Sequence, residues 1–208
     1  MKTPILPAER WPECLAVLRG GGVVAVPTDT VYGLAALPLD VHGIDRIYAA
    51  KGRPEDKALP MLVASLGDAE EISLLAHESR RLCAAFWPGA LTVVAEAQPG
   101  FRSPALATDG TIGLRMPALA LTVHVIDAAG GVLAVTSANL SGQAPARSAR
   151  DVLDQLDGRI DMIIDGGPSP GGVASTVVRV AAGAVEVLRE GAIPRERLEA
   201  VLRGEGAG

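Results

Sequence analysis

Short apolar runs bounded by glycine or proline alternate along this chain with segments in which apolar residues recur every three or four positions. Runs of the first kind are typical of buried strands, and the second spacing is typical of helices. The apolar runs predict strands over Val23–Val26, Leu59–Val63, Ala90–Ala95, Thr111–Met116, Val132–Val135, Met162–Ile164, Ser175–Val180 and Ala184–Leu188. The helical spacing predicts helices over Glu9–Leu18, Val41–Ala50, Ala69–Leu75, His77–Phe86, Leu119–Ala129, Ser148–Leu156 and Pro194–Leu202.

Strands and helices follow one another without strict order, which predicts an α/β fold with a twisted mixed sheet. Of the 208 residues, 49% are apolar but only 3% are aromatic, so the core must consist mainly of Ala, Val, Leu and Ile. Such a core suits a sheet that helices cover. Since no internal repeat and no long linker interrupts the pattern, we expect one domain over residues 1–208.

The formal net charge of −5 argues against a protein that coats nucleic acid without sequence preference, because such binding depends on neutralising phosphates. Cys14 and Cys83 lie in predicted helices and outside any metal-binding spacing, so we expect two buried thiols. The N-terminus lacks a signal-peptide pattern, and no run of about 18 apolar residues predicts a membrane span. A cytoplasmic protein fits these features.

One stretch combines hydroxyls at a strand end with cations at a helix end. Its residues are Thr28, Asp29, Thr30, Lys51, Arg53 and Lys57. A guanidinium can bind a phosphate through two parallel hydrogen bonds, and the lysines add point charges, so the stretch suits a bound anion. The alternative is a solvated helix C-terminus, where cations are favoured without any ligand.

A polar turn, Thr136–Gly142, directly follows the predicted strand Val132–Val135. Open α/β sheets bind ligands beyond the carboxyl ends of their strands. Ser137 and Asn139 can therefore hydrogen-bond a phosphate, a ribose or a base edge. The alternative is an ordinary turn made of residues that favour turns.

Arg115 stands in an otherwise apolar predicted strand. Strand alternation places Arg115 on one face with Thr111 and Gly113, opposite three apolar side chains. That face could line a pocket. A strand with one side in water explains the same pattern.

The predicted hairpin carries Ser175 at its start and Arg189 at its end. These groups could close over a ligand, or they could belong to an ordinary hairpin with a surface arginine. No phosphate-loop, dinucleotide-binding or zinc-binding spacing occurs, and no Cys–His pair indicates a thiol nucleophile.

Together these segments closely resemble the YrdC-like family of threonylcarbamoyl-AMP synthases, in its short, single-domain form. The resemblance covers about Gly22 to Gly191 and rests on PTDTVYGL, KGRPEDKALP, FWPGALT, TIGLRMP, SANLSG and ASTVV. It implies a twisted sheet with helices around a deep basic cavity. It also implies an L-threonylcarbamoyladenylate synthase, a nucleotidyltransferase that converts L-threonine, bicarbonate and ATP into threonylcarbamoyl-AMP and pyrophosphate. Other tRNA-modifying proteins would then transfer the threonylcarbamoyl group to an adenosine of tRNA.

The resemblance further implies roles for individual residues. Lys51 and Arg53 would be catalytic. The threonine-binding set would be Thr30, Arg115, Val135 and Ser175. The ATP-binding set would be Arg53, Lys57, Thr111, Ser137, Asn139 and Arg189. Mg²⁺ would accompany ATP, held mostly by phosphate oxygens and water, and a weak contact with tRNA is also conceivable.

Two positions depart from the family pattern. Leu62 stands where many members carry His, and Ala174 stands where many carry Glu. Two alternatives remain open: an RNA-binding module of the same fold without ATP turnover, and a carbamoyl-adenylate enzyme that uses carbamoyl phosphate. An acidic chain poor in aromatic residues disfavours the RNA-binding module.

Overall fold

The structure is a computed structural model that describes residues 2–54, 57–181 and 183–205. Its strands are β1 (Ile5–Pro7), β2 (Val24–Val26), β3 (Gly33–Ala36), β4 (Met61–Val63), β5 (Ser73–Leu74), β6 (Leu91–Ala97), β7 (Thr111–Arg115), β8 (Val132–Ser137), β9 (Met162–Asp165), β10 (Thr176–Ala181) and β11 (Ala184–Arg189). Its helices are η1 (Ala8–Arg10), α1 (Glu13–Arg19), α2 (Val41–Lys51), α3 (Leu66–Ile72), α4 (His77–Phe86), α5 (Ala120–Ala128), α6 (Ala149–Leu156) and α7 (Arg195–Arg203).

All the strands form one mixed sheet in the order β1-β9-β2-β3-β8-β4-β7-β6-β10-β11, with β5 paired to β6 off this path. The pairs β1–β9, β2–β9, β4–β7 and β6–β10 are parallel, and the other pairs are antiparallel. The predicted α/β class and mixed sheet are confirmed.

The sequence pattern misplaces three parts of the fold. The predicted helix Glu9–Leu18 is wrong at its start, because a 3-10 turn precedes α1 and Pro12 lies between them. The predicted helix Ala69–Leu75 ends early, since the chain becomes extended at Ser73 and pairs with β6. Strands β1 and β3 were not predicted. The small residues of β3 have little intrinsic strand preference, and pairing with β2 and β8 on both sides makes this segment a strand.

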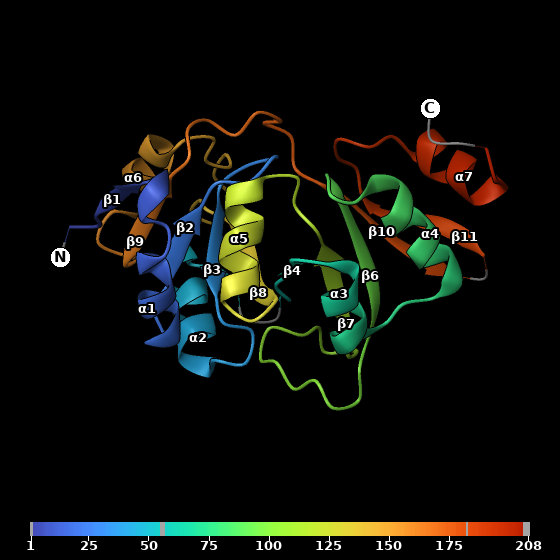
Figure 1. Cartoon of the computed structure of the whole chain (residues 1–208), viewed down its shortest axis with the longest axis horizontal. Helices are drawn as coiled ribbons and strands as arrows, with labels where there is room; N and C mark the ends of the chain where they lie inside the picture. The colour runs from blue at the N-terminus through green and yellow to red at the C-terminus, as the bar shows by residue number, and fades with distance from the viewer. Residues whose placement is uncertain (1, 55–56, 182, 206–208) are drawn as a thin grey trace.

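Helices cover the two faces of the sheet unequally (Figure 1). On one face, α1 and α5 contribute Cys14, Leu18, Val125 and Ile126 to an apolar cluster with β2, β8 and β9. On the other face, α2, α3, α4, α6 and α7 all contribute to a larger cluster. The first face therefore has helices over its β2, β8 and β9 side, while the same face of β6, β7 and β10 carries half-buried and polar side chains.

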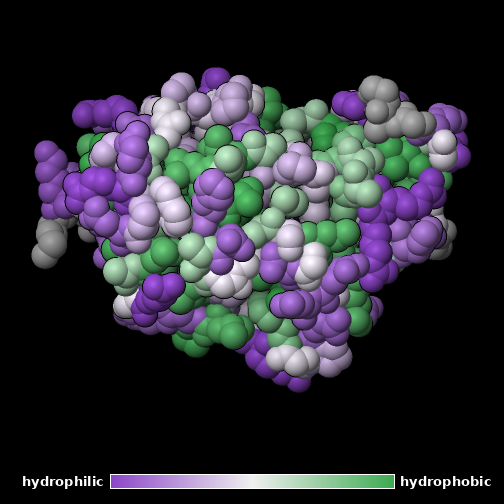
Figure 2. Space-filling view, in the orientation of Figure 1, coloured by the Kyte–Doolittle hydropathy of each residue, from purple (hydrophilic) through white to green (hydrophobic). Residues whose placement is uncertain are grey.

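Both cysteines are buried, as predicted. Burial raises the pKa of Cys14 to about 11 and that of Cys83 to about 12, so both remain protonated thiols at neutral pH. None of the helices in the described residues combines the length and the apolar character that crossing a membrane requires. On the face seen in Figure 2, apolar side chains are scattered among polar ones.

The predicted N-cap of α6 is confirmed as a capping box. The Ser148 hydroxyl accepts a hydrogen bond from the Asp151 amide, and the Asp151 carboxylate accepts one from the Ser148 amide. We therefore expect Ser148→Ala to lower the free energy of unfolding by about 1 kcal/mol in urea titrations, because helix amides lose their partner. Ser148→Asp, which keeps a capping oxygen, is the control and should stay near wild type. Equal losses in both variants would contradict this role.

Candidate functional site

A cavity of about 340 Å³ opens on the first face of the sheet, beside the N-terminal end of α5. Its floor consists of residues from β3, β4, β6, β7 and β8, and its rim comes from the segments before β3, β4, β10 and α6 and from the end of β11. The lining residues are Thr28, Thr30, Val31, Tyr32, Gly33, Arg53, Ala58, Pro60, Leu62, Thr92, Arg115, Val135, Thr136, Ser137, Pro145, Ala174, Ser175 and Arg189. Three of them are arginines and none is acidic, so the cavity favours an anionic ligand.

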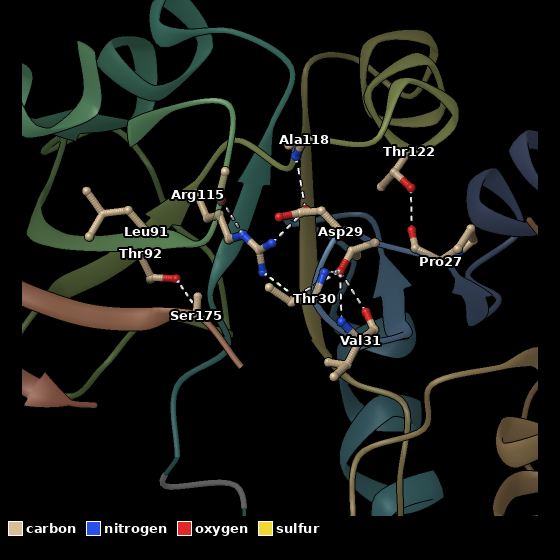
Figure 3. Close-up of polar contacts among 12 residues, drawn as sticks. Pro27, Asp29, Thr30, Val31, Leu91, Thr92, Arg115, Ala118, Thr122 and Ser175 are labelled. Atoms are coloured by element: carbon tan, nitrogen blue, oxygen red, sulfur yellow. Dashed lines mark hydrogen bonds and ion pairs between the residues drawn. The ribbon is translucent and has the colours of Figure 1, made fainter. Parts of the chain in front are cut away.

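Arg115 at the end of β7 is the most tightly held cation of the cavity, with only 6% of its surface exposed. Its Nη2 donates to the Asp29 carboxylate at 2.7 Å, its Nη1 to the Thr30 hydroxyl at 2.8 Å, and its Nε to the Gly89 carbonyl at 2.8 Å (Figure 3). Burial lowers the pKa of Arg115, and the Asp29 carboxylate opposes that lowering. The guanidinium is thus fixed in one orientation at the floor of the cavity.

The loop between β2 and β3 is shaped by its own side chains. The Thr28 hydroxyl donates to the Val31 carbonyl at 2.6 Å and accepts from the Thr30 amide at 3.1 Å, which is the local turn that short hydroxyl residues form (Figure 3). Thr122 of α5 donates to the Pro27 carbonyl and ties this loop to the helix. As a result Thr30, a predicted threonine-binding residue, points its hydroxyl at Arg115.

A glycine-rich segment that precedes β10 closes one side of the cavity. The amides of Gly171 and Gly172 donate to the Asp29 and Thr30 carbonyls at 2.9 and 2.8 Å. A Cβ at Gly171 would lie 2.6 Å from the Asp29 carbonyl oxygen, so only glycine permits this approach. The segment then delivers Ala174 and Ser175 to the lining.

Ser175 and Arg189 meet at the rim, as the hairpin pattern suggested. The Ser175 hydroxyl lies 2.8 Å from that of Thr92, and Arg189 donates to the Ser175 carbonyl at 2.8 Å and to its hydroxyl at 3.1 Å. Val135 also lines the cavity, and its amide donates to the Pro60 carbonyl. Thr92 also lines the cavity and was not predicted, although it is the one hydroxyl residue besides small and apolar ones in the run Ala90–Ala95.

Lys51 lies behind the Ser137–Asn139 turn instead of among the lining residues. Its Nζ donates to the carbonyls of Ser137 and Asn139, the latter at 2.8 Å, and only 3% of the residue is exposed. Burial, together with the nearby charge of Arg53, lowers the pKa of Lys51 to about 8. In this arrangement Lys51 supports the turn that carries Ser137, and its predicted catalytic role remains a prediction.

The other predicted ATP-binding residues are distributed unevenly. Arg53 lines the cavity and donates to the Ala58 carbonyl at 3.1 Å. Asn139 is buried and donates through its amide to the carbonyls of Leu140 and Gln143, while its Oδ1 has no partner within the described chain. Lys57 is exposed and lies outside the lining. Thr111 lines a different cavity, at the other end of β7.

Both departures from the family pattern fall on the cavity wall. Leu62 of β4 is paired in register with Arg115, so the two side chains are neighbours on the same face of the sheet. Ala174 precedes Ser175 in the lining. The wall therefore has apolar surface next to its buried guanidinium. Within the described residues, no group of three or more His, Cys, Asp or Glu side chains could hold a metal ion.

The depressed pKa of Lys51 predicts a pH dependence of stability. Between pH 8 and 10.5 the folded protein binds fewer protons at this residue than the unfolded chain, so its contribution to stability rises with pH across that window. We expect the free energy of unfolding of wild type to rise relative to Lys51→Met between these pH values, measured by urea titration. Parallel pH profiles of the two proteins would rule out the depressed pKa.

The Asp29–Arg115 pair predicts a charge-specific loss of stability. Asp29→Asn keeps an acceptor for the Ala118 amide but leaves the buried guanidinium without its counter-charge, so we expect the free energy of unfolding to fall by about 3 kcal/mol in urea titrations. The double variant Asp29→Asn/Arg115→Met removes the unpaired charge and should recover part of that loss. If the double variant were less stable by the sum of the single losses, the pair would not be coupled.

Comparison with known proteins agrees with this fold. The family model Sua5_yciO_yrdC, described as "Telomere recombination", matches residues 16–191. A curated Bacillus subtilis relative, "Threonylcarbamoyl-AMP synthase", is 41% identical over 91% of this chain and 56% of its own length. The crystal structure of P. abyssi Sua5 complexed with L-threonine superposes with a TM-score of 0.91 at 34% identity, covering 96% of this chain and 61% of that chain.

A crystal structure of E. coli YciO shares the fold, with a TM-score of 0.83 at 23% identity over 92% of this chain and 97% of that chain. The chain spans little more than half the length of its Bacillus subtilis and Pyrococcus abyssi relatives, 56% and 58%. The matched residues 16–191 contain every residue that lines the cavity. The chain belongs to the Sua5/YciO/YrdC family.

Proposed function

We propose that this chain is an L-threonylcarbamoyladenylate synthase that forms threonylcarbamoyl-AMP and pyrophosphate from L-threonine, bicarbonate and ATP. The observation that carries the proposal is the cavity, in which a buried arginine, the hydroxyls of Thr30, Thr92 and Ser175 and two further arginines converge. Support comes from relatives named threonylcarbamoyl-AMP synthase and from the similar P. abyssi protein, which was crystallised with L-threonine.

The chemistry requires positioning more than a protein nucleophile. A carbamate, made from the threonine amine and bicarbonate with loss of water, would attack the α-phosphorus of ATP, forming the new P–O bond while the bond to pyrophosphate breaks. The protein would hold the reactants together and stabilise the charge that develops on the phosphoryl oxygens. A cavity with three arginines and without a Cys–His pair suits this task.

Threonine would bind at the floor of the cavity. The described bonds of Arg115 to Asp29, Thr30 and Gly89 leave further N–H groups of its guanidinium for the substrate carboxylate. Thr30 and Ser175 would hydrogen-bond the amino acid, and Val135 would contact it. The apolar wall at Leu62 offers a surface for the substrate methyl group.

ATP would lie across the same face of the sheet. Arg53, Arg189 and Ser137 would bind the phosphates from the lining, and Lys57 would approach them from the rim. Asn139 would contribute to ATP binding indirectly, because it and Lys51 stabilise the turn that carries Ser137. Thr111 is four residues from Arg115 along β7, or about 14 Å, so it would meet the nucleoside end of ATP.

Mg²⁺ would bind with ATP as part of the substrate. When bound, it neutralises charge on the triphosphate and thereby helps pyrophosphate to leave. The donor set of the site fits this arrangement, because its hydroxyls and arginines leave Mg²⁺ to phosphate oxygens and water.

We also place the chain in tRNA modification, with downstream threonylcarbamoyl-transfer proteins as partners and at most a weak contact with tRNA. The names of the relatives support this assignment. Because one sheet joins β1 to β11, we further propose that residues 1–208 act as a single YrdC-like domain.

Release of labelled pyrophosphate from ATP, with threonine and bicarbonate omitted in turn, tests the proposal. We expect release to require both, and we expect Arg53→Ala and Ser137→Ala each to lower kcat/KM by about 10- to 100-fold, because each removes a bond to charged phosphate. Arg150→Ala, which removes an exposed arginine of α6, is the control and should keep full activity.

Several outcomes would contradict the proposal. Carbamoyl phosphate that replaces both bicarbonate and threonine would indicate the carbamoyl-adenylate enzyme. Salt-dependent RNA affinity without any pyrophosphate release would indicate the RNA-binding module. Folded Arg53→Ala and Ser137→Ala variants with wild-type turnover would refute the assignments of those residues.

A further inference from the structure

A second cavity, of about 390 Å³, lies where β10 separates from β6 and β5 joins it. Its apolar wall includes Leu74, which is 48% exposed and is one of the few large apolar side chains at the surface. Its polar residues are Ser79, Glu96, Thr111 and Arg179. Apolar walls with a few convergent polar groups are typical of sites for small organic ligands.

Strand register places the Glu96 and Thr111 side of this second cavity on the same face of the sheet as the first cavity. Thr92, Val94 and Glu96 alternate onto one face of β6, and Val94 and Glu96 are paired with Gly113 and Thr111 of β7. Arg115 shares that face of β7. Glu96 and Thr111 therefore lie side by side, about 14 Å along the strands from Thr92 and Arg115. A ligand that touched both pairs of residues would have to span this distance.

The two cavities differ in charge. The first contains three arginines and no acidic lining residue, whereas the second contains the Glu96 carboxylate. The Arg179 Nη2 lies 3.8 Å from the Asp109 carboxylate, so the positive charge of Arg179 is partly balanced by Asp109. Within the described chain the exposed Glu96 carboxylate makes neither a hydrogen bond nor an ion pair. It repels phosphate, but it can accept hydrogen bonds from a neutral ligand that carries hydroxyl groups.

We propose that Glu96 is a specificity-determining residue that binds the vicinal ribose hydroxyls of the nucleotide in the second cavity. The inference rests on the proposed synthase function, in which the α-phosphate would lie beside the threonine that Arg115 holds and the nucleoside would lie near Thr111. A carboxylate has two oxygens that suit a vicinal diol, and acidic side chains bind ribose hydroxyls in dinucleotide-binding folds. The apolar surface of Leu74 and Val94 is then available to the base.

The proposal predicts discrimination between ribose and deoxyribose. We expect wild type to use ATP with a KM about tenfold lower than that for 2′-deoxy-ATP or 3′-deoxy-ATP, because each analogue lacks one hydrogen bond to a charged acceptor. Glu96→Gln should raise KM for ATP by about tenfold, leave kcat within about twofold, and bring the three nucleotides to similar KM values. Glu71→Gln, an equal loss of exposed charge on α3, should keep the wild-type preference.

Equilibrium binding of the same three nucleotides, measured by calorimetry, separates this inference from the proposed function. Wild type that binds nucleotide but releases no pyrophosphate with threonine and bicarbonate would refute the synthase function alone. An active Glu96→Gln variant that keeps the wild-type preference for ATP would overturn the role of Glu96. An equal rise of KM for all three nucleotides would also overturn it, because a general effect of charge or folding does not depend on ribose hydroxyls.

Discussion

The buried Arg115 guanidinium is the interaction on which the cavity depends. It joins the end of β7 to the loop between β2 and β3 through Asp29 and Thr30, and to the segment before β6 through Gly89. These segments are far apart in sequence, and a charge this deeply buried is stable only while its partners remain in place. The need to satisfy one guanidinium therefore sets the geometry of this end of the cavity.

Unequal helix coverage of the sheet explains where the site lies. Helices α1 and α5 supply apolar side chains to one face, and five helices supply them to the other. Beyond the N-terminus of α5, the first face keeps hydroxyls and charged groups on β6, β7 and β10. Because no helix of the described chain packs on this part of the sheet face, a polar ligand can bind there without displacing core side chains. Both cavities include residues of this face.

Groups behind the lining matter as much as the lining itself. Lys51 donates to the Ser137 and Asn139 carbonyls, and the Asn139 side-chain amide donates to the Gln143 carbonyl. These hydrogen bonds hold the turn that carries Ser137. Within the described residues no carboxylate pairs with Lys51, and burial, which lowers its pKa, disfavours its charged form. A site that binds phosphate would stabilise such a cation when its ligand arrives.

The sequence by itself determined the α/β class, most of the helices and strands, the buried thiols and the α6 cap, because these follow from local periodicity and local hydrogen bonds. It also identified Thr30, Arg115, Ser137, Ser175 and Arg189 as polar groups at strand ends, and the fold brings them to one cavity. Only the tertiary structure decided that Lys51 turns inward, that Thr111 lies in a second cavity, and that β3 is a strand. Those outcomes depend on pairing and burial between distant segments, and local sequence patterns carry no record of such contacts.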